Sequence, residues 1–87
     1  MSTENVESIT PAQSRAARAL LEMTQPQLAE VAGLGLSTIV DFENSRRQVS
    51  HQAIVAIRIA LQRAGVEFIA ENGGGAGARL RRRSRSK

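Results

Sequence analysis

The chain has 87 residues, which is enough for one domain of modest stability. It contains no cysteine and one histidine, which excludes a disulfide framework and a cluster of thiolate or imidazole ligands, so we expect no metal and no cofactor. Because two phenylalanines are its only aromatic residues, the core must consist mainly of Ala, Leu, Ile and Val, and this composition favours small helices in close contact.

The charge of the chain is unevenly distributed. The formal net charge is +4, yet six of the twelve basic side chains lie in residues 79–87, where there is no acid. The other six are outnumbered by the eight acidic side chains of the preceding residues. We therefore expect the folded body to bind any polyanion through a few placed contacts rather than through a generally basic surface.

Residues 1–9 are polar and mixed in charge, and they have no repeating apolar face, so we expect a flexible N-terminal arm. They also lack the basic start and apolar stretch of a secretory signal. No part of the chain approaches the roughly 20 apolar residues that span a bilayer. The sequence thus predicts a cytoplasmic protein without a membrane partner.

Helices are predicted throughout residues 10–65, the main domain. The segments 10–13 and 24–27 each combine a capping Thr, an early Pro and a Gln three residues after the Thr, which together are typical of a helix start. The second of these helices should end near Ala32, because the next residue, Gly33, can adopt a positive φ. A third helix is expected over about residues 36–44.

A fourth helix is expected after Ser50, which can cap it, and Gly65 should end it. The next segment, 66–81, alternates with a period of two on either side of a glycine-rich turn, and this pattern predicts a β-hairpin. A lone two-stranded ribbon is marginally stable in water. We therefore expect the hairpin either to pack on the helices or to pair with a second subunit.

The segment 25–44 meets the requirement for two short helices that cross closely. Such a crossing needs small or apolar residues wherever the helices approach each other or the core. The positions concerned are Leu28, Ala29, Ala32, Gly33, Leu34, Ile39 and Phe42. All seven carry suitable side chains.

The residues 24–33, Ser37-Thr38-Ile39 and 42–47 resemble the phage repressor and Cro family of helix-turn-helix domains, also called the xenobiotic-response-element (XRE) family. The resemblance covers roughly residues 11–65. It implies an all-α fold, a four- to five-helix repressor-like helix-turn-helix domain, with a possible short C-terminal β-hairpin or strand. It also implies a bacterial or phage transcriptional regulator that binds double-stranded DNA in the nucleoid, with the helix at 36–44 in the major groove.

The resemblance assigns roles to individual residues. Gln25 matches a residue that hydrogen-bonds a phosphate, whereas Ser37 and Thr38 match side chains that meet base edges. Hydroxyl groups can donate or accept there, and the methyl of Thr38 can contact a thymine methyl. The residues expected to contact DNA are Gln25, Leu36, Ser37, Thr38, Asp41, Asn44, Arg46 and Arg47.

Asn44, Arg46 and Arg47 match contacts to backbone phosphates, which provide affinity and salt dependence without reading the sequence. Arg18 and Glu43 match a partly buried ion pair between the first helix and the recognition helix. The alternative is a surface pair worth under about 1 kcal/mol. We assign no catalytic role to these residues and expect no enzyme, because no nucleophile with a base, carboxylate cluster or metal set occurs.

Three residues on the outer side of the expected recognition helix depart from the family pattern. Leu36 and Val40 can contact thymine methyls, but Asp41 would repel phosphate unless it accepts from a cytosine amino group or pairs with an arginine. The same three residues could instead form a protein-binding patch. Two hypotheses remain: a sequence-specific regulator acting as a homodimer, and an antitoxin-like or anti-activator module that binds another regulatory protein.

The basic segment 82–87 is expected to be a disordered tail. Three interpretations stay open for it: solvated disorder, an arm that holds DNA without sequence preference, and a surface for RNA or another acidic partner.

Overall fold

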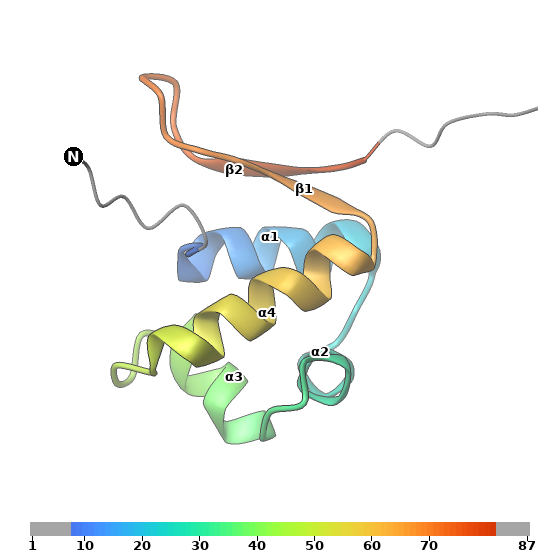
Figure 1. Cartoon of the computed structure of the whole chain (residues 1–87), viewed down its shortest axis with the longest axis vertical. Coiled ribbons are helices and arrows are strands. Elements are labelled where there is room, and N and C mark those ends of the chain that lie inside the picture. Colours follow the sequence, from blue (N-terminus) through green and yellow to red (C-terminus); the bar gives the residue numbers. More distant parts are fainter. Residues whose placement is uncertain (1–7, 82–87) are drawn as a thin grey trace, which may run out of the picture.

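The computed structural model describes residues 8–81 and consists of four helices followed by one antiparallel hairpin (Figure 1). The elements are α1 (Pro11–Leu21), α2 (Gln25–Ala32), α3 (Leu36–Glu43), α4 (His51–Arg63), β1 (Val66–Ile69) and β2 (Gly77–Leu80). The expected mostly helical fold with a short hairpin is confirmed. Residues 1–7 of the expected arm and the whole expected tail, 82–87, lie outside the described residues.

The first two helices begin with the hydrogen bonds that their sequences predict. The backbone N–H of Gln13 donates to Oγ1 of Thr10 at 3.0 Å, and the Thr10 N–H donates to Oε1 of Gln13 at 2.9 Å. Thr24 and Gln27 form the same reciprocal pair. Because these bonds satisfy amides that would otherwise lack partners, they fix where α1 and α2 start.

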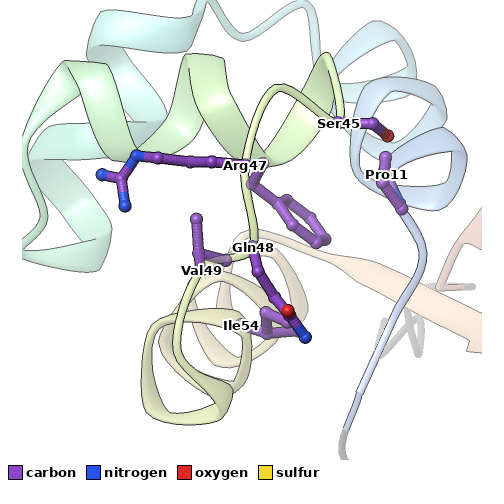
Figure 2. A pocket seen from close by; sticks show the side chains of 7 residues that line it. Pro11, Ser45, Arg47, Gln48, Val49 and Ile54 are labelled. Atoms are coloured by element: carbon purple, nitrogen blue, oxygen red, sulfur yellow. The ribbon is translucent and has the colours of Figure 1, made fainter.

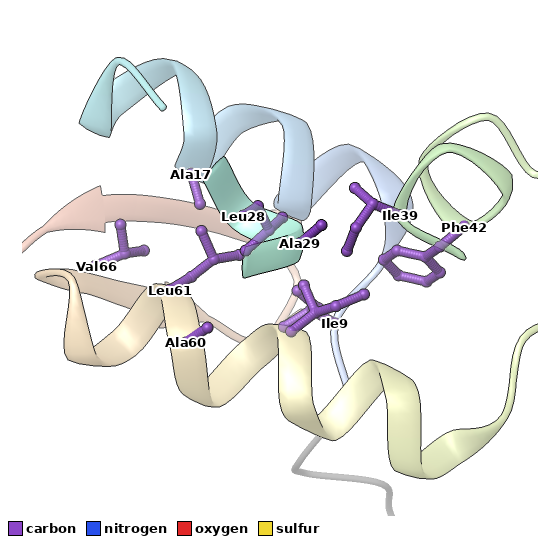
Figure 3. Close-up of a cluster of buried hydrophobic side chains, with 10 residues drawn as sticks. Ile9, Ala17, Leu28, Ala29, Ile39, Phe42, Ala60, Leu61 and Val66 are labelled. Atoms are coloured by element: carbon purple, nitrogen blue, oxygen red, sulfur yellow. The ribbon is translucent and has the colours of Figure 1, made fainter. Parts of the chain in front are cut away.

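The core lies between the helices and beneath the hairpin (Figure 3). It consists of small and aliphatic side chains together with one phenylalanine: Ile9, Ala17, Leu28, Ala29, Ile39, Phe42, Ile57, Ala60, Leu61 and Val66. Ile9 belongs to the expected flexible arm, yet it is only 5% exposed. The packed body therefore begins before the capping residue of α1.

The hairpin packs on the helices, which is one of the two arrangements expected for it. Its strands pair Val66 with Leu80 and Ile69 with Gly77, and both strands contact α1. Val66 is fully buried. At the other end of the hairpin, Nε2 of Gln13 donates to the carbonyls of Ile69 and Gly77 at 3.2 and 3.0 Å. One side chain of α1 thus holds both strands.

α1 lies between α3 and the hairpin, because it contacts both of them (Figure 1). α3 therefore occupies the part of the molecule away from the strands. None of the helices within residues 8–81 has the length and apolarity to cross a membrane.

Candidate nucleic-acid interface

A short turn joins α2 to α3 and determines how closely they approach. Gly33 ends α2 with a φ of 71°, a left-handed conformation that side chains disfavour. The N–H of Leu34 then donates to the carbonyl of Ala29 at 3.0 Å, which closes the end of the helix. Ala29 is 6% exposed and α2 contacts α3. The two helices thus form a close pair joined by residues 33–35.

α3 has one buried side and one outward side. Ile39, Phe42 and Glu43 point into the molecule, and none is more than 6% exposed. Ser37, Asp41 and Asn44 follow one another at the i, i+4 and i+7 positions, so they lie on the opposite side. Ser37 and Asn44 are exposed, whereas Asp41 is half-buried. The outward side therefore carries short polar groups.

The other expected contact residues border this polar stripe. Leu36, at the start of α3, is 45% exposed, and Thr38 is half-buried. Arg46 and Arg47 follow the end of α3 and are both exposed. The structure thus brings the expected base-contacting residues and the expected phosphate-contacting arginines to one part of the surface.

Glu43 is a fully buried carboxylate that three helices share. Arg18 of α1 donates to it through Nε and Nη2, with the shortest distance 2.7 Å. Ser14 donates at 2.5 Å and Gln25 of α2 at 3.0 Å. Since α3 supplies the acceptor and the other two helices supply the donors, the network fixes α3 relative to α1 and α2.

The surroundings of Glu43 keep it ionised. Burial by itself would raise the pKa of this carboxyl, but hydrogen bonds from Arg18, Ser14 and Gln25, together with the charge of Arg18, outweigh it and lower the pKa below the ordinary value. A charged Glu43 is therefore part of the folded structure at neutral pH.

Asp41 forms an ion pair with Arg47. The distance from Nε of Arg47 to Oδ2 of Asp41 is 2.6 Å, and the side chains are 59% and 19% exposed, respectively. Figure 2 shows a hollow of about 340 Å³ at the end of α3, where Arg47 turns away from the other lining residues. The arginine thus folds back alongside α3 instead of filling this hollow.

Three polar residues of α1 have contacts that sequence reasoning missed. Ser14, expected on the edge of the apolar face, is fully buried against Glu43. Arg15, expected to face water, is exposed but also donates through Nη1 to the carbonyl of Glu43. Gln13 holds the hairpin in addition to capping α1. A polar residue within an apolar helical stripe, as at Ser14, was the available signal.

These features, a close helix pair followed by an exposed polar helix face and two arginines, can now be compared with known proteins. A family model described as Helix-turn-helix matches residues 15–68, which is more than half of the chain. The chain belongs to the helix-turn-helix family. It is of the phage repressor and Cro type, also called the XRE family. The search of curated proteins found no match.

Membership makes the chain a DNA-binding helix-turn-helix regulator, from a family that is generally not enzymatic. In the terms of this family, α2 and α3 are the helix pair, and α3 is the element that such domains place in the major groove.

Proposed function

We propose that the protein is a sequence-specific transcriptional regulator that inserts α3 into the major groove of DNA. The observation that carries this proposal is the division of α3 into a buried side and a polar outward side ending in Arg46 and Arg47. A groove-reading helix needs such a division, because its scaffold side must be fixed while its other side meets base edges.

Within this proposal, Ser37 and Thr38 contact bases from the first turn of α3. Leu36 is close enough in sequence and exposed enough to contact a thymine methyl. Asn44 and Arg46, beyond the last turn, contact phosphates on one flank, and Gln25 contacts a phosphate on the other. Phosphate contacts at both ends would fix the register of the helix in the groove.

We further propose that the protein acts as a homodimer, because a single recognition helix of eight residues reads few base pairs. The apolar strand β1 was the expected reason for dimerisation, but Val66 is buried within its own chain. Support now comes from Leu80, which is 50% exposed at the end of β2, and from the unpaired edges of a two-stranded sheet. Pairing there would place two copies of α3 about 34 Å apart on one face of DNA.

A selection of duplexes from a random pool by the full chain tests this function. We expect an enriched site with two-fold symmetry, bound more weakly by the Thr38→Ala variant, and a dimer by light scattering at micromolar concentration. Leu80→Ser should shift the chain toward monomer. Binding without any sequence preference would contradict the proposal, and a monomer both free and on DNA would contradict its homodimer part.

A second candidate function, a module that binds another regulatory protein, is favoured by the exposed Leu36 beside the half-buried Val40. The two functions differ in their response to salt. DNA binding through arginines weakens steeply as salt rises, whereas an apolar protein contact does not. Absence of binding to any genomic fragment at low salt would favour the protein-binding function.

A further inference from the structure

The ion pair between Asp41 and Arg47 lies at the part of α3 that the proposed function turns toward base pairs. Asp41 occupies the middle of the outward stripe, between Ser37 and Asn44. A bare carboxylate at this position would repel the DNA backbone. Arg47 neutralises it at 2.6 Å, so the pair as a whole carries no net charge.

The pair leaves the donor end of Arg47 free. Asp41 accepts from Nε, and among residues 8–81 neither Nη1 nor Nη2 of Arg47 has a hydrogen-bond partner. These two nitrogens form a planar fork that donates two parallel hydrogen bonds. In the major groove, guanine presents two adjacent acceptors, O6 and N7, that match this fork.

The position of the fork separates a base contact from a phosphate contact. Arg47 folds back beside α3 to reach Asp41 (Figure 2). Its guanidinium is thereby held at the groove-facing stripe and not beyond the end of the helix. Arg46, its exposed neighbour, has no ion pair within the described residues and suits a phosphate contact instead.

We propose that Arg47 reads a guanine in the operator and that Asp41 is the positioning residue that holds its fork. This inference rests on the proposed function and changes the role that the family resemblance gives to Arg47. It predicts that each half-site contains a G·C pair selected by Arg47, and that Asp41 contributes to that selection without contacting the guanine.

The test measures affinities of the full chain for its selected duplex and for duplexes in which each G·C pair is replaced by A·T in turn. For the unchanged protein, replacing one particular pair should weaken binding by roughly five- to one-hundred-fold, the range of one bidentate contact. Arg47→Lys keeps the charge but loses the fork, and Asp41→Ala removes the support. Both should lose most of that preference. Asp41→Ala should also bind unrelated DNA more tightly, because an acid is removed.

Arg46→Ala is the matched control and should weaken binding to all duplexes by a similar factor while the guanine preference remains. If Arg47→Lys and Asp41→Ala keep the full preference at every G·C pair, the inference is overturned and Arg47 is a phosphate contact. If the unchanged chain selects a site without such a pair, the inference fails while the proposed function stands. If the chain selects no sequence, both fail.

Discussion

Nε2 of Gln25, the first residue of α2, donates a 3.0 Å hydrogen bond to Oε1 of Glu43, the last residue of α3. The same oxygen accepts from Nη2 of Arg18 at 2.7 Å. One carboxylate therefore joins the outer ends of the helix pair to α1. Since an amide nitrogen carries two hydrogens, Gln25 keeps one N–H with which to contact a phosphate while the other holds Glu43.

Removing Arg18 should therefore destabilise the fold more than removing an exposed arginine. Arg18→Ala leaves the buried charge of Glu43 without its main partner, and such a change costs about 3 to 5 kcal/mol. The check is urea unfolding followed by circular dichroism. Arg63→Ala, an exposed arginine at the end of α4, is the control and should change stability by less than about 0.5 kcal/mol. Equal effects would show that the pair contributes little.

The stability of the protein should fall in acid because of Glu43. The pKa of this carboxyl is lower in the folded than in the unfolded protein, so its contribution is complete above the ordinary value of 4.5 and is lost as the pH falls toward the folded pKa. Unfolding free energies measured between pH 7 and pH 3 should show this loss. Glu43→Gln should be less stable at pH 7 and have a shallower acid slope, and an unchanged slope would contradict this explanation.

Gln13→Ala should loosen the hairpin. The substitution removes two donors from the carbonyls of Ile69 and Gly77 as well as the cap of α1, for a total of about 1 to 3 kcal/mol. Gln27→Ala is the matched control, because Gln27 forms the same cap at α2 on the exposed surface. Amide hydrogen exchange of β1 and β2 should accelerate in the first variant only, and similar exchange in both would count against the clamp.

Two glycines of the turn should respond to substitution in opposite ways. Gly35 caps α3 without a side-chain hydrogen bond at a φ of −71°, so Gly35→Ser should add a cap worth a few tenths of a kcal/mol. Gly33 has a φ of 71°, and Gly33→Ser should cost about 1 kcal/mol even though there is space for a Cβ. Thermal unfolding would measure both, and the same sign of change for the two would refute the assignment.

Much of the fold could be predicted from local signals. The capping boxes at Thr10 and Thr24 indicate where α1 and α2 begin, and the glycine at position 33 indicates where α2 ends. These signals involve residues at most a few positions apart, so a sequence displays them directly. The period-two alternation likewise predicted the hairpin, with β2 beginning one residue earlier than expected.

The polar contacts between distant residues could not be predicted in the same way. Gln13 meets the hairpin across 64 positions, and Ser14 meets Glu43 across 29. Nothing in the spacing of such residues indicates their pairing, because only the packed helices bring them together. The family resemblance supplied the pair of Arg18 with Glu43 but gave no indication of the additional donors Ser14 and Gln25.

The most direct test of the central claim is an NMR titration of the full chain with its selected duplex, followed at backbone amides. We predict that the largest shifts fall on residues 36–47 and on Gln25, with smaller changes in β1 and β2. If the largest shifts fell on the hairpin or α4 while α3 remained unchanged, α3 would not be the DNA-reading element.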